Sequence, residues 1–304
     1  MRVIILGSAA GGGVPQWNCG CPNCTAARTE GCGRTQSSVA VSADGERWIL
    51  LNASPDLRTQ LAAHRALWPP SGMRGTPVEA VILTDGEIDH TLGLLLLRES
   101  AARLPVYAPA GVTALLGEQW PLYRVLSAYS GVEPRALEEG RAIALTDRAG
   151  STLGISCSAT AVARRPPRYA ATARAATWDV GLRLTDQQSG GTLAYVPTAG
   201  AIDDAVRRVA SGADLLLFDG TFWADDELRA TGGSGGAPTA REMGHLPVGG
   251  AAGSLQLLPR LGVKRTVLVH INNTNPILCR SSAERAQVEA AGLVVAEDAM
   301  EFDL

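Results

Sequence analysis

Long hydrophobic runs, an excess of charge of one sign and a secretory leader are all missing from this sequence. The longest apolar runs, such as Leu92 to Leu97, fall far short of the roughly 20 residues that a membrane-spanning helix needs. The stretch Val3 to Leu6, with one arginine before it, is too short for a secretory signal. The net charge of -3 gives no electrostatic reason to expect nucleic acid or an anionic membrane as a partner. We therefore expect a cytoplasmic protein with neither partner.

A disulfide framework is not expected either, although the chain has six cysteines. Cys19, Cys21 and Cys24 crowd into one loop, and the other three are scattered. Clustered thiols in a reducing compartment are more often metal ligands than disulfide partners. Three thiolates within six residues can share a tetrahedral zinc ion, which needs a fourth ligand from elsewhere. Cys32 is the nearest candidate, so we expect a structural zinc loop near residues 19–32.

Strand and helix patterns alternate along the whole chain, without a composition break or an internal repeat. We therefore expect one α/β domain spanning residues 1–304. Predicted strands are Val3 to Leu6, Ser37 to Ser42, Trp48 to Asn52, Val78 to Leu83, Val106 to Ala108, Ala142 to Leu145, Thr152 to Ser158, Val180 to Leu184, Thr192 to Val196, Asp214 to Phe218, Val267 to His270 and Val294 to Ala296. Predicted helices are Leu57 to Leu67, Thr91 to Arg103, Ala114 to Ser127, Ile202 to Ser211, Val248 to Leu258 and Glu284 to Ala291, and a mobile segment is expected over Thr231 to Pro238.

Three predicted strands end in groups that bind metals. The first is followed by Asp85, Glu87, Asp89 and His90 before a predicted helix begins. The apolar run Leu215 to Phe218 ends in Asp219, and Val267 to Val269 ends in His270. Charged groups at the ends of buried strands are costly unless they are paired or bound to a metal. Three such ends favour a metal site built from Asp89, His90, Asp219 and His270.

Each of these groups also has a structural interpretation. The carboxylates at positions 85, 87 and 89 are typical of an acidic first helical turn, where they compensate the helix dipole. Of only four histidines, His64 lies in a predicted helix and is expected to be solvated or to have a capping role. His245 follows a glycine-rich stretch and is either a lid residue for acid–base chemistry or the partner in a structural hydrogen bond.

The segment Thr84 to His90 resembles the metallo-β-lactamase signature Thr-His-x-His-x-Asp-His, with Asp85 and Glu87 in place of the two leading histidines. The resemblance implies that superfamily's four-layer αββα sandwich. Five further motifs, in order, resemble the family of coenzyme PQQ synthesis protein B over essentially the whole chain. They are Cys19 to Cys24, Arg34 to Ser38, Asn52 to Asp56, Met243 to Pro247 and His270 to Pro276.

The expected mechanism follows from the absence of histidines at positions 85 and 87. Hydrolytic members of the superfamily use two metals to generate and hold a hydroxide. Without imidazoles at positions 85 and 87, we expect one metal, and the remaining set approaches the two-histidine, one-carboxylate arrangement of iron(II) oxygenases. The resemblance implies hydroxylation of the tyrosine ring in the cross-linked glutamate–tyrosine intermediate of pyrroloquinoline quinone (PQQ) synthesis. Iron(II) is the expected active-site metal, and zinc and manganese remain alternatives.

Further site residues follow from this interpretation. Asp85 and Glu87 would be free carboxylates beside the metal, able to accept a phenol proton or to hold ammonium groups. Arg34 would pair with a substrate carboxylate. In related phosphodiesterases the fourth zinc ligand lies three residues after the last active-site histidine, which here is Asn273, so Cys32 and Asn273 both remain open.

Two other functions stay open at this stage. The chain could be a one-metal hydrolase, or a carrier that binds finished PQQ and passes it on. The missing histidines argue against the hydrolase, and the intact ligand set argues against a pure carrier. Contacts with other PQQ-pathway proteins and a homodimer are compatible with the sequence, which predicts neither.

Overall fold

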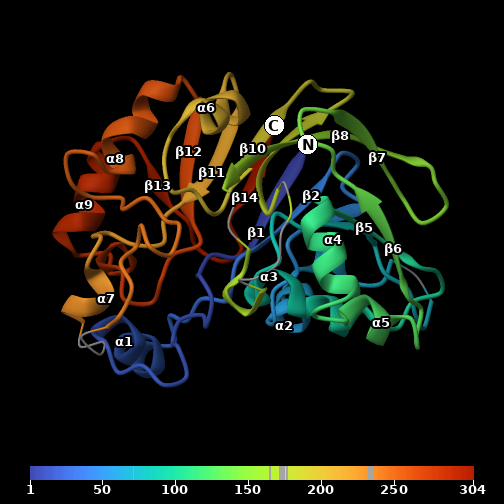
Figure 1. Ribbon diagram of the computed structural model, residues 1–304, viewed down its shortest axis with the longest axis horizontal. Coiled ribbons are helices and arrows are strands. Elements are labelled where there is room, and N and C mark those ends of the chain that lie inside the picture. Colours follow the sequence, from blue (N-terminus) through green and yellow to red (C-terminus); the bar gives the residue numbers. More distant parts are fainter. Residues whose placement is uncertain (71, 164–165, 171–174, 176, 232–235) are drawn as a thin grey trace.

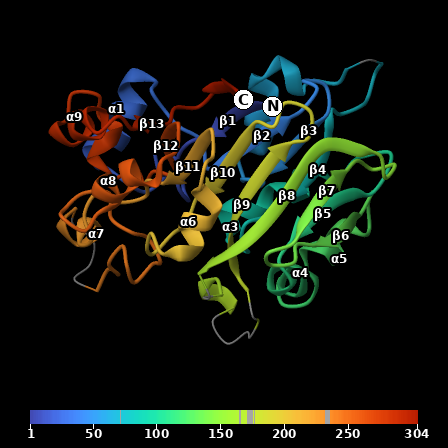
Figure 2. The same ribbon diagram turned by 90° about the horizontal axis from the view of Figure 1, so that it is seen from above.

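Two β-sheets form the centre of the computed structural model (Figure 1). The structure describes residues 1–304 except 71, 164–165, 171–174, 176 and 232–235. Over these residues the first sheet has the order β14 (Glu301–Asp303), β1 (Arg2–Gly7), β2 (Ser38–Ser42), β3 (Trp48–Leu51), β4 (Val78–Ile82), β5 (Leu104–Ala108), β6 (Val132–Ala136). The second has the order β13 (Val294–Val295), β12 (Arg265–Val269), β11 (Leu215–Asp219), β10 (Thr192–Val196), β9 (Asp179–Asp186), β8 (Thr152–Ala163), β7 (Ala142–Thr146). Figure 2 shows the second sheet's strands side by side in this order.

Helices cover the outer faces of both sheets, with those around α4 and those around α9 on opposite sides in Figure 1. The α-helices are α1 (Pro22–Glu30), α2 (Leu57–Ala63), α3 (Ile88–Thr91), α4 (Ala110–Gly117), α5 (Leu122–Leu126), α6 (Asp204–Ala210), α7 (Glu227–Ala230), α8 (Ser254–Leu257) and α9 (Ala283–Ala290). Short 3-10 helices are η1 (Arg65–Leu67), η2 (Leu92–Leu97), η3 (Arg168–Ala170), η4 (Leu258–Leu261) and η5 (Pro276–Leu278). Within the described ranges, none of these helices is long and apolar enough to cross a membrane.

The core has three layers of apolar side chains, which follow from the alternation of side chains along each strand. In β3, Ile49 and Leu51 face the second sheet, whereas Leu50 faces the helices. The layer between the sheets joins residues such as Ile49 to Leu182 and Leu217. One outer layer packs α2, α4 and α5 on the first sheet, and the other packs α6, α8 and α9 on the second. The result is the four-layer αββα sandwich expected from the sequence.

Parallel pairing brings the metal-binding segments to one edge of the sandwich. β4 runs parallel to β3 and β5, and β11 runs parallel to β10 and β12. Their carboxyl ends lead into the loops that carry Asp89 and His90 from the first sheet, and Asp219 and His270 from the second. The site therefore lies where the two sheets meet, since Asp89 and His270 are in contact.

Most predicted strands are confirmed, including the β2–β3 hairpin around Asp44. The predicted helix Thr91 to Arg103 is wrong: α3 ends at Thr91 and continues only as η2. A Cβ on Gly93 would lie 2.2 Å from the Ser54 carbonyl oxygen, so this segment tightens against the loop after β3. The predicted helix Val248 to Leu258 shortens to α8 followed by η4, because its glycines pack closely: a Cβ on Gly249 would lie 2.7 Å from Trp223.

Further departures concern elements that the sequence patterns did not indicate. The cysteine loop continues into α1, with Pro22 in its first turn, and β6 and β14 were not predicted. His64 is buried and forms the C-cap of α2, so the capping alternative is confirmed and the solvated one is wrong. The segment Thr231 to Pro238, expected to be mobile, lies partly outside the described residues.

Candidate metal centre

An aspartate lies directly behind His90 in the turn between β4 and α3. The Nδ1 atom of His90 is 2.8 and 2.7 Å from the two Asp85 carboxylate oxygens, and both side chains are buried. The Thr84 hydroxyl and the Glu87 backbone amide also donate to this carboxylate, at 2.8 and 2.9 Å. Asp85 is therefore not the free carboxylate expected from the sequence, because its oxygens are occupied by hydrogen bonds within this turn.

The other nitrogen of His90 faces Asp89 and His270. Among the described residues its Nε2 atom is buried without a hydrogen-bond partner and lies 3.8 Å from Asp89 Oδ2. His270 Nε2 is 3.3 Å from the same oxygen. One atom from each of these three side chains lies within 4.8 Å of the others. A buried imidazole nitrogen without a partner is costly, and a metal ion would remove that cost, so these residues fit a metal.

His270 and His245 are held by a second buried carboxylate. Asp219 Oδ2 accepts hydrogen bonds from His245 Nδ1 at 2.8 Å and from the Ala199 amide at 3.0 Å. Asp219 Oδ1 accepts from the Thr221 amide at 3.0 Å and the Thr221 hydroxyl at 2.6 Å. That hydroxyl is also 2.8 Å from His270 Nδ1. Asp219, His245 and His270 form a second group whose ligand atoms lie within 4.8 Å of one another.

The three histidines share one arrangement. In His90 and His245 the Nδ1 atom bonds a carboxylate directly, and in His270 it bonds one through the Thr221 hydroxyl. An Nδ1 that donates to such a partner leaves Nε2 as the free ligand atom. The rings of His90 and His270 lie 5.1 Å apart, and those of His245 and His270 lie 5.5 Å apart. The two groups of candidate metal ligands thus share His270.

Backbone conformation also shapes this edge of the sandwich. His270 has a φ of 55°, in the left-handed region that few non-glycine residues adopt, so the chain turns sharply after β12. The glycine-rich N-terminal loop approaches the site, because a Cβ on Gly11 would lie 3.2 Å from Asp89 Cγ.

Carboxylates surround the candidate ligands. Glu87 is exposed by surface area, but the protein around its carboxylate partly desolvates it, and this, together with the charges of Asp85 and Asp89, raises its pKa to about 7. Burial and the charge of Asp85 also raise the pKa of Asp179, to about 8. Tyr169 donates a 2.5 Å hydrogen bond to the Gly86 carbonyl, so η3 covers the turn that holds these groups. Asp179 and Tyr169 were not identified from the sequence.

Arg34 does not face this centre. Its guanidinium donates to the Ala296 carbonyl and to the Ser8 hydroxyl, and it lies 3.7 Å from Glu297. These contacts anchor the loop before β2 to the turn after β13. The expected pairing with a substrate carboxylate therefore finds no support in this arrangement.

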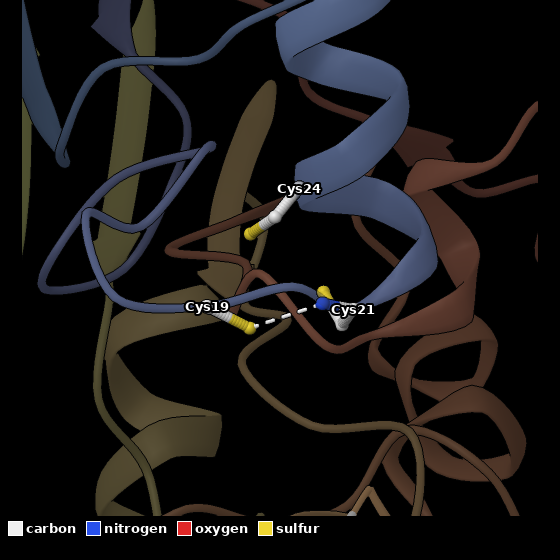
Figure 3. Close-up of side chains that lie close together, drawn as sticks. All are labelled: Cys19, Cys21 and Cys24. Carbon is white, nitrogen blue, oxygen red and sulfur yellow. Dashed lines mark hydrogen bonds between the residues drawn. The ribbon is translucent and has the colours of Figure 1, made fainter.

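The three clustered cysteines point toward one another (Figure 3). Cys24 comes from α1, and Cys19 and Cys21 come from the loop before it. The Nδ2 atom of Asn273 lies 3.1, 3.6 and 3.4 Å from the sulfurs of Cys19, Cys21 and Cys24, so Asn273 closes the cluster. A half-turn of the Asn273 side-chain amide exchanges its nitrogen and oxygen, and would present the oxygen to the three sulfurs. Cys32 is exposed and is not part of this group.

Comparison with known proteins places the whole chain beside one group of relatives. Residues 47–271 match the family model described as beta-lactamase superfamily domain. The chain is 46% identical to coenzyme PQQ synthesis protein B of Cupriavidus necator over 307 residues, with 99% of each chain covered. It is 43% identical to the protein of the same name from Methylococcus capsulatus over 313 residues, with 100% of each covered.

Solved structures agree with this placement. The crystal structure of Zn²⁺-bound PqqB from Methylobacterium extorquens is 39% identical, has a TM-score of 0.89 and matches over 100% of both chains. A diphosphatase of the PhnP family has a TM-score of 0.69 at 23% identity, with 99% of this chain and 97% of the other covered, and shares the fold.

Proposed function

The chain belongs to the family of coenzyme PQQ synthesis protein B, and from this membership we propose that it acts in PQQ biosynthesis as a one-metal oxygenase. The proposed substrate is the cross-linked glutamate–tyrosine amino acid, and the proposed reaction is hydroxylation of its tyrosine ring. We also propose that residues 1–304 act as one domain in the cytoplasm. The observation that carries the proposal is the convergence of Asp89, His90 and His270, two imidazoles and one carboxylate.

We assign Asp89, His90 and His270 as the metal ligands. Asp89 is favoured over Asp219 because the two Asp219 oxygens already accept four hydrogen bonds from Ala199, Thr221 and His245. In this proposal Asp219 keeps its place in the metal centre by holding His245 and, through Thr221, His270. Carboxylates behind ligating histidines fix the ring orientation and raise its basicity as a ligand.

An iron(II) ion held there would supply the one-electron chemistry needed to use molecular oxygen, which amino-acid side chains do not provide. Placing one oxygen atom of O₂ on a ring carbon leaves the second atom to be reduced to water. That balance needs two electrons from an external reductant and two protons. Iron(II) is the proposed metal, and the donor set also accepts zinc or manganese.

The protein's own side chains orient the substrate and move protons. Glu87 lies close enough to Asp89 and His90 for their charges to shift its pKa, and it would receive an ammonium group or the phenol proton. His245 stacks on His270 with an interplanar angle of 22° and donates Nδ1 to Asp219, which leaves Nε2 as a proton acceptor. The arrangement of β9 and η3 over Gly86 would exclude water from this side.

We further propose that Cys19, Cys21 and Cys24 hold a structural zinc, with Asn273 as the fourth ligand. Asn273 is favoured over Cys32 because it already contacts all three sulfurs. The site would tie α1 to the loop after His270.

The test is product analysis with isotopically labelled oxygen. Anaerobically purified protein is loaded with iron(II), mixed with the cross-linked amino acid and ascorbate, and exposed to ¹⁸O₂. One ¹⁸O atom in the ring product supports the proposal. Unchanged substrate, combined with tight binding of finished PQQ, would instead support a carrier.

A further inference from the structure

One group of contacts in the structure, around Asn52, has no role in the proposed reaction. Asn52 follows β3, is fully buried and has a φ of 62°, in the left-handed region. Asparagine tolerates this region better than most side chains do. Its side chain contacts Thr84, which follows β4. β4 is the neighbour of β3 in the first sheet.

The hydrogen bonds between Asn52 and Thr84 continue to Asp85 and from there to His90. The Thr84 amide donates to Asn52 Oδ1 at 2.9 Å, and Asn52 Nδ2 donates to the Thr84 hydroxyl at 2.9 Å. A hydroxyl has one proton to give, and the Thr84 hydroxyl lies closer to Asp85 Oδ2, at 2.8 Å, than to Asn52 Oδ1, at 3.2 Å, so it donates to Asp85. Asp85, a carboxylate that can only accept, then accepts the hydrogen bond from His90 Nδ1–H.

The same segment also holds the backbone of His90. The Ala53 amide donates to the His90 carbonyl at 2.7 Å, and the Gly93 amide donates to the Ala53 carbonyl at 2.9 Å. No side chain fits at position 93, since a Cβ there would overlap Ser54. The segment from Asn52 to Ser54 therefore fixes both the side chain and the backbone of His90.

We propose that Asn52 and Thr84 are positioning residues that fix the orientation and the Nδ1–H tautomer of His90, so that its Nε2 is presented to the metal. The inference rests on the proposed metal centre and adds the residues that prepare one of its ligands. Tyr195 also holds the Asn52 side chain, because its hydroxyl lies 3.4 Å from Asn52 Nδ2 and 3.4 Å from the Ser37 hydroxyl.

The first test compares two substitutions of Thr84. Thr84→Val keeps the shape but cannot donate to Asp85, whereas Thr84→Ser keeps the hydroxyl. Cobalt(II) is titrated into the metal-free proteins and followed by its absorption spectrum. Groups behind metal ligands change affinity by about 10- to 100-fold, and we expect a loss of that size in Thr84→Val and near-normal affinity in Thr84→Ser.

Thr192→Val is the matched control. Thr192 is also a threonine of a central strand, β10, and its hydroxyl bonds the Asp214 carboxylate, away from the candidate ligands. This variant should bind cobalt like the wild type. A general loss of stability would weaken both valine variants alike and would overturn the inference.

The second test does not depend on a metal. Nitrogen NMR of the metal-free protein reports which ring nitrogen of each histidine carries the proton. Asn52→Asp places a carboxylate that competes with Asp85 for the Thr84 proton, so the His90 Nδ1 signal should shift from its wild-type position, as it should in Thr84→Val. Signals identical to those of the wild type in both variants would overturn the inference.

These results separate the inference from the proposed function. If wild-type protein binds no cobalt at this centre, the metal proposal fails, and the NMR comparison still decides whether Asn52 and Thr84 set the tautomer. If the wild type binds cobalt and Thr84→Val binds it equally well, the inference fails and the proposed function stands.

Discussion

At the scale of single residues, the carboxylates of Asp89 and Asp219 differ in how many hydrogen bonds they already accept. Asp89 Oδ2 lies beside two imidazole Nε2 atoms, whereas both oxygens of Asp219 accept bonds from groups behind the histidines. An oxygen already shared by two donors has little capacity left for a metal. The difference predicts unequal effects of removing the two charges.

Asp89→Asn should therefore release the active-site metal. Asp219→Asn should retain it with an affinity lowered by about 10- to 100-fold, the range for groups behind the ligands. Titration of metal-free protein with cobalt(II) measures both affinities. Equal losses in the two variants would show that Asp219 is itself a ligand.

Glu87→Gln tests the carboxylate that the superfamily signature does not have. The amide keeps the shape but cannot receive a proton or pair with an ammonium group, so substrate-dependent oxygen uptake should slow by about 100-fold, a typical value for one acid–base group. Metal content should stay constant. Glu46→Gln, an exposed glutamate in the β2–β3 turn, is the control and should have wild-type activity. Wild-type turnover in Glu87→Gln would remove Glu87 from the mechanism.

The sequence predicted the ligand histidines but not their partners. His270 directly follows an apolar run and His90 lies in the acidic turn after another, so local sequence is enough to mark both. Thr84, Asn52 and Thr221 have their roles because they contact residues far away in the sequence. No local sequence pattern predicts such contacts. For the same reason Arg34 was assigned to a substrate, although it contacts Ala296 near the other end of the chain.

At the scale of elements, the β2–β3 turn is closed by one carboxylate. Asp44 accepts bonds from the Glu46 and Arg47 amides at 2.9 and 2.8 Å and from the Ser42 hydroxyl at 3.1 Å. Partial burial opposes ionisation, but these bonds lower the pKa of Asp44 to about 2. The charged form is therefore favoured more in the folded than in the unfolded chain.

Asp44→Asn should lower the free energy of unfolding by about 1 kcal/mol at neutral pH, the usual net value of such hydrogen bonds. The folded-state pKa is depressed, so this contribution is present above the unfolded pKa of roughly 4 and fades as pH falls through about 2. Urea unfolding at several pH values measures the difference. A difference that stays constant between pH 5 and pH 2 would contradict the assignment.

The cysteine cluster joins α1 to the loop after β12. Cys21→Ser should lose one equivalent of zinc and lower the free energy of unfolding by on the order of 4 kcal/mol, since a structural metal contributes to folding. Cys32→Ser is the control: Cys32 is exposed and outside the cluster, so this variant should keep its zinc. Metal analysis and thermal unfolding of both variants decide between Asn273 and Cys32 as the fourth ligand.

Strands were easier to predict than helices for a physical reason. Most strands here are buried apolar runs, a strong local signal, as in β11 with Leu215 to Phe218. The helices over-predicted around Gly93 and Gly249 end where a neighbouring backbone or ring leaves no room, which is a tertiary effect. The strand β14 pairs with β1 across nearly the full length of the chain, and a three-residue strand has no pattern of its own.

At the scale of the whole molecule, the metal centre is assembled from both halves of the sandwich. The first sheet supplies Asp89 and His90, and the second supplies His270, Asp219 and, from the loop before α8, His245. A metal bound by residues from both sheets would also hold the sheets together. The superfamily fold is kept, and in the proposed function the residues that replace histidines at positions 85 and 87 limit the centre to one metal.

The number of metals at this centre tests the account most directly. Anaerobically purified wild-type protein and its His270→Ala variant are analysed for total metal, and oxygen uptake is measured with the cross-linked amino acid and a reductant. We predict one active-site metal besides one zinc in the wild type, and only the zinc, without substrate-dependent oxygen uptake, in the variant. Two active-site metals in the wild type, or full oxygen uptake in His270→Ala, would contradict the one-metal oxygenase.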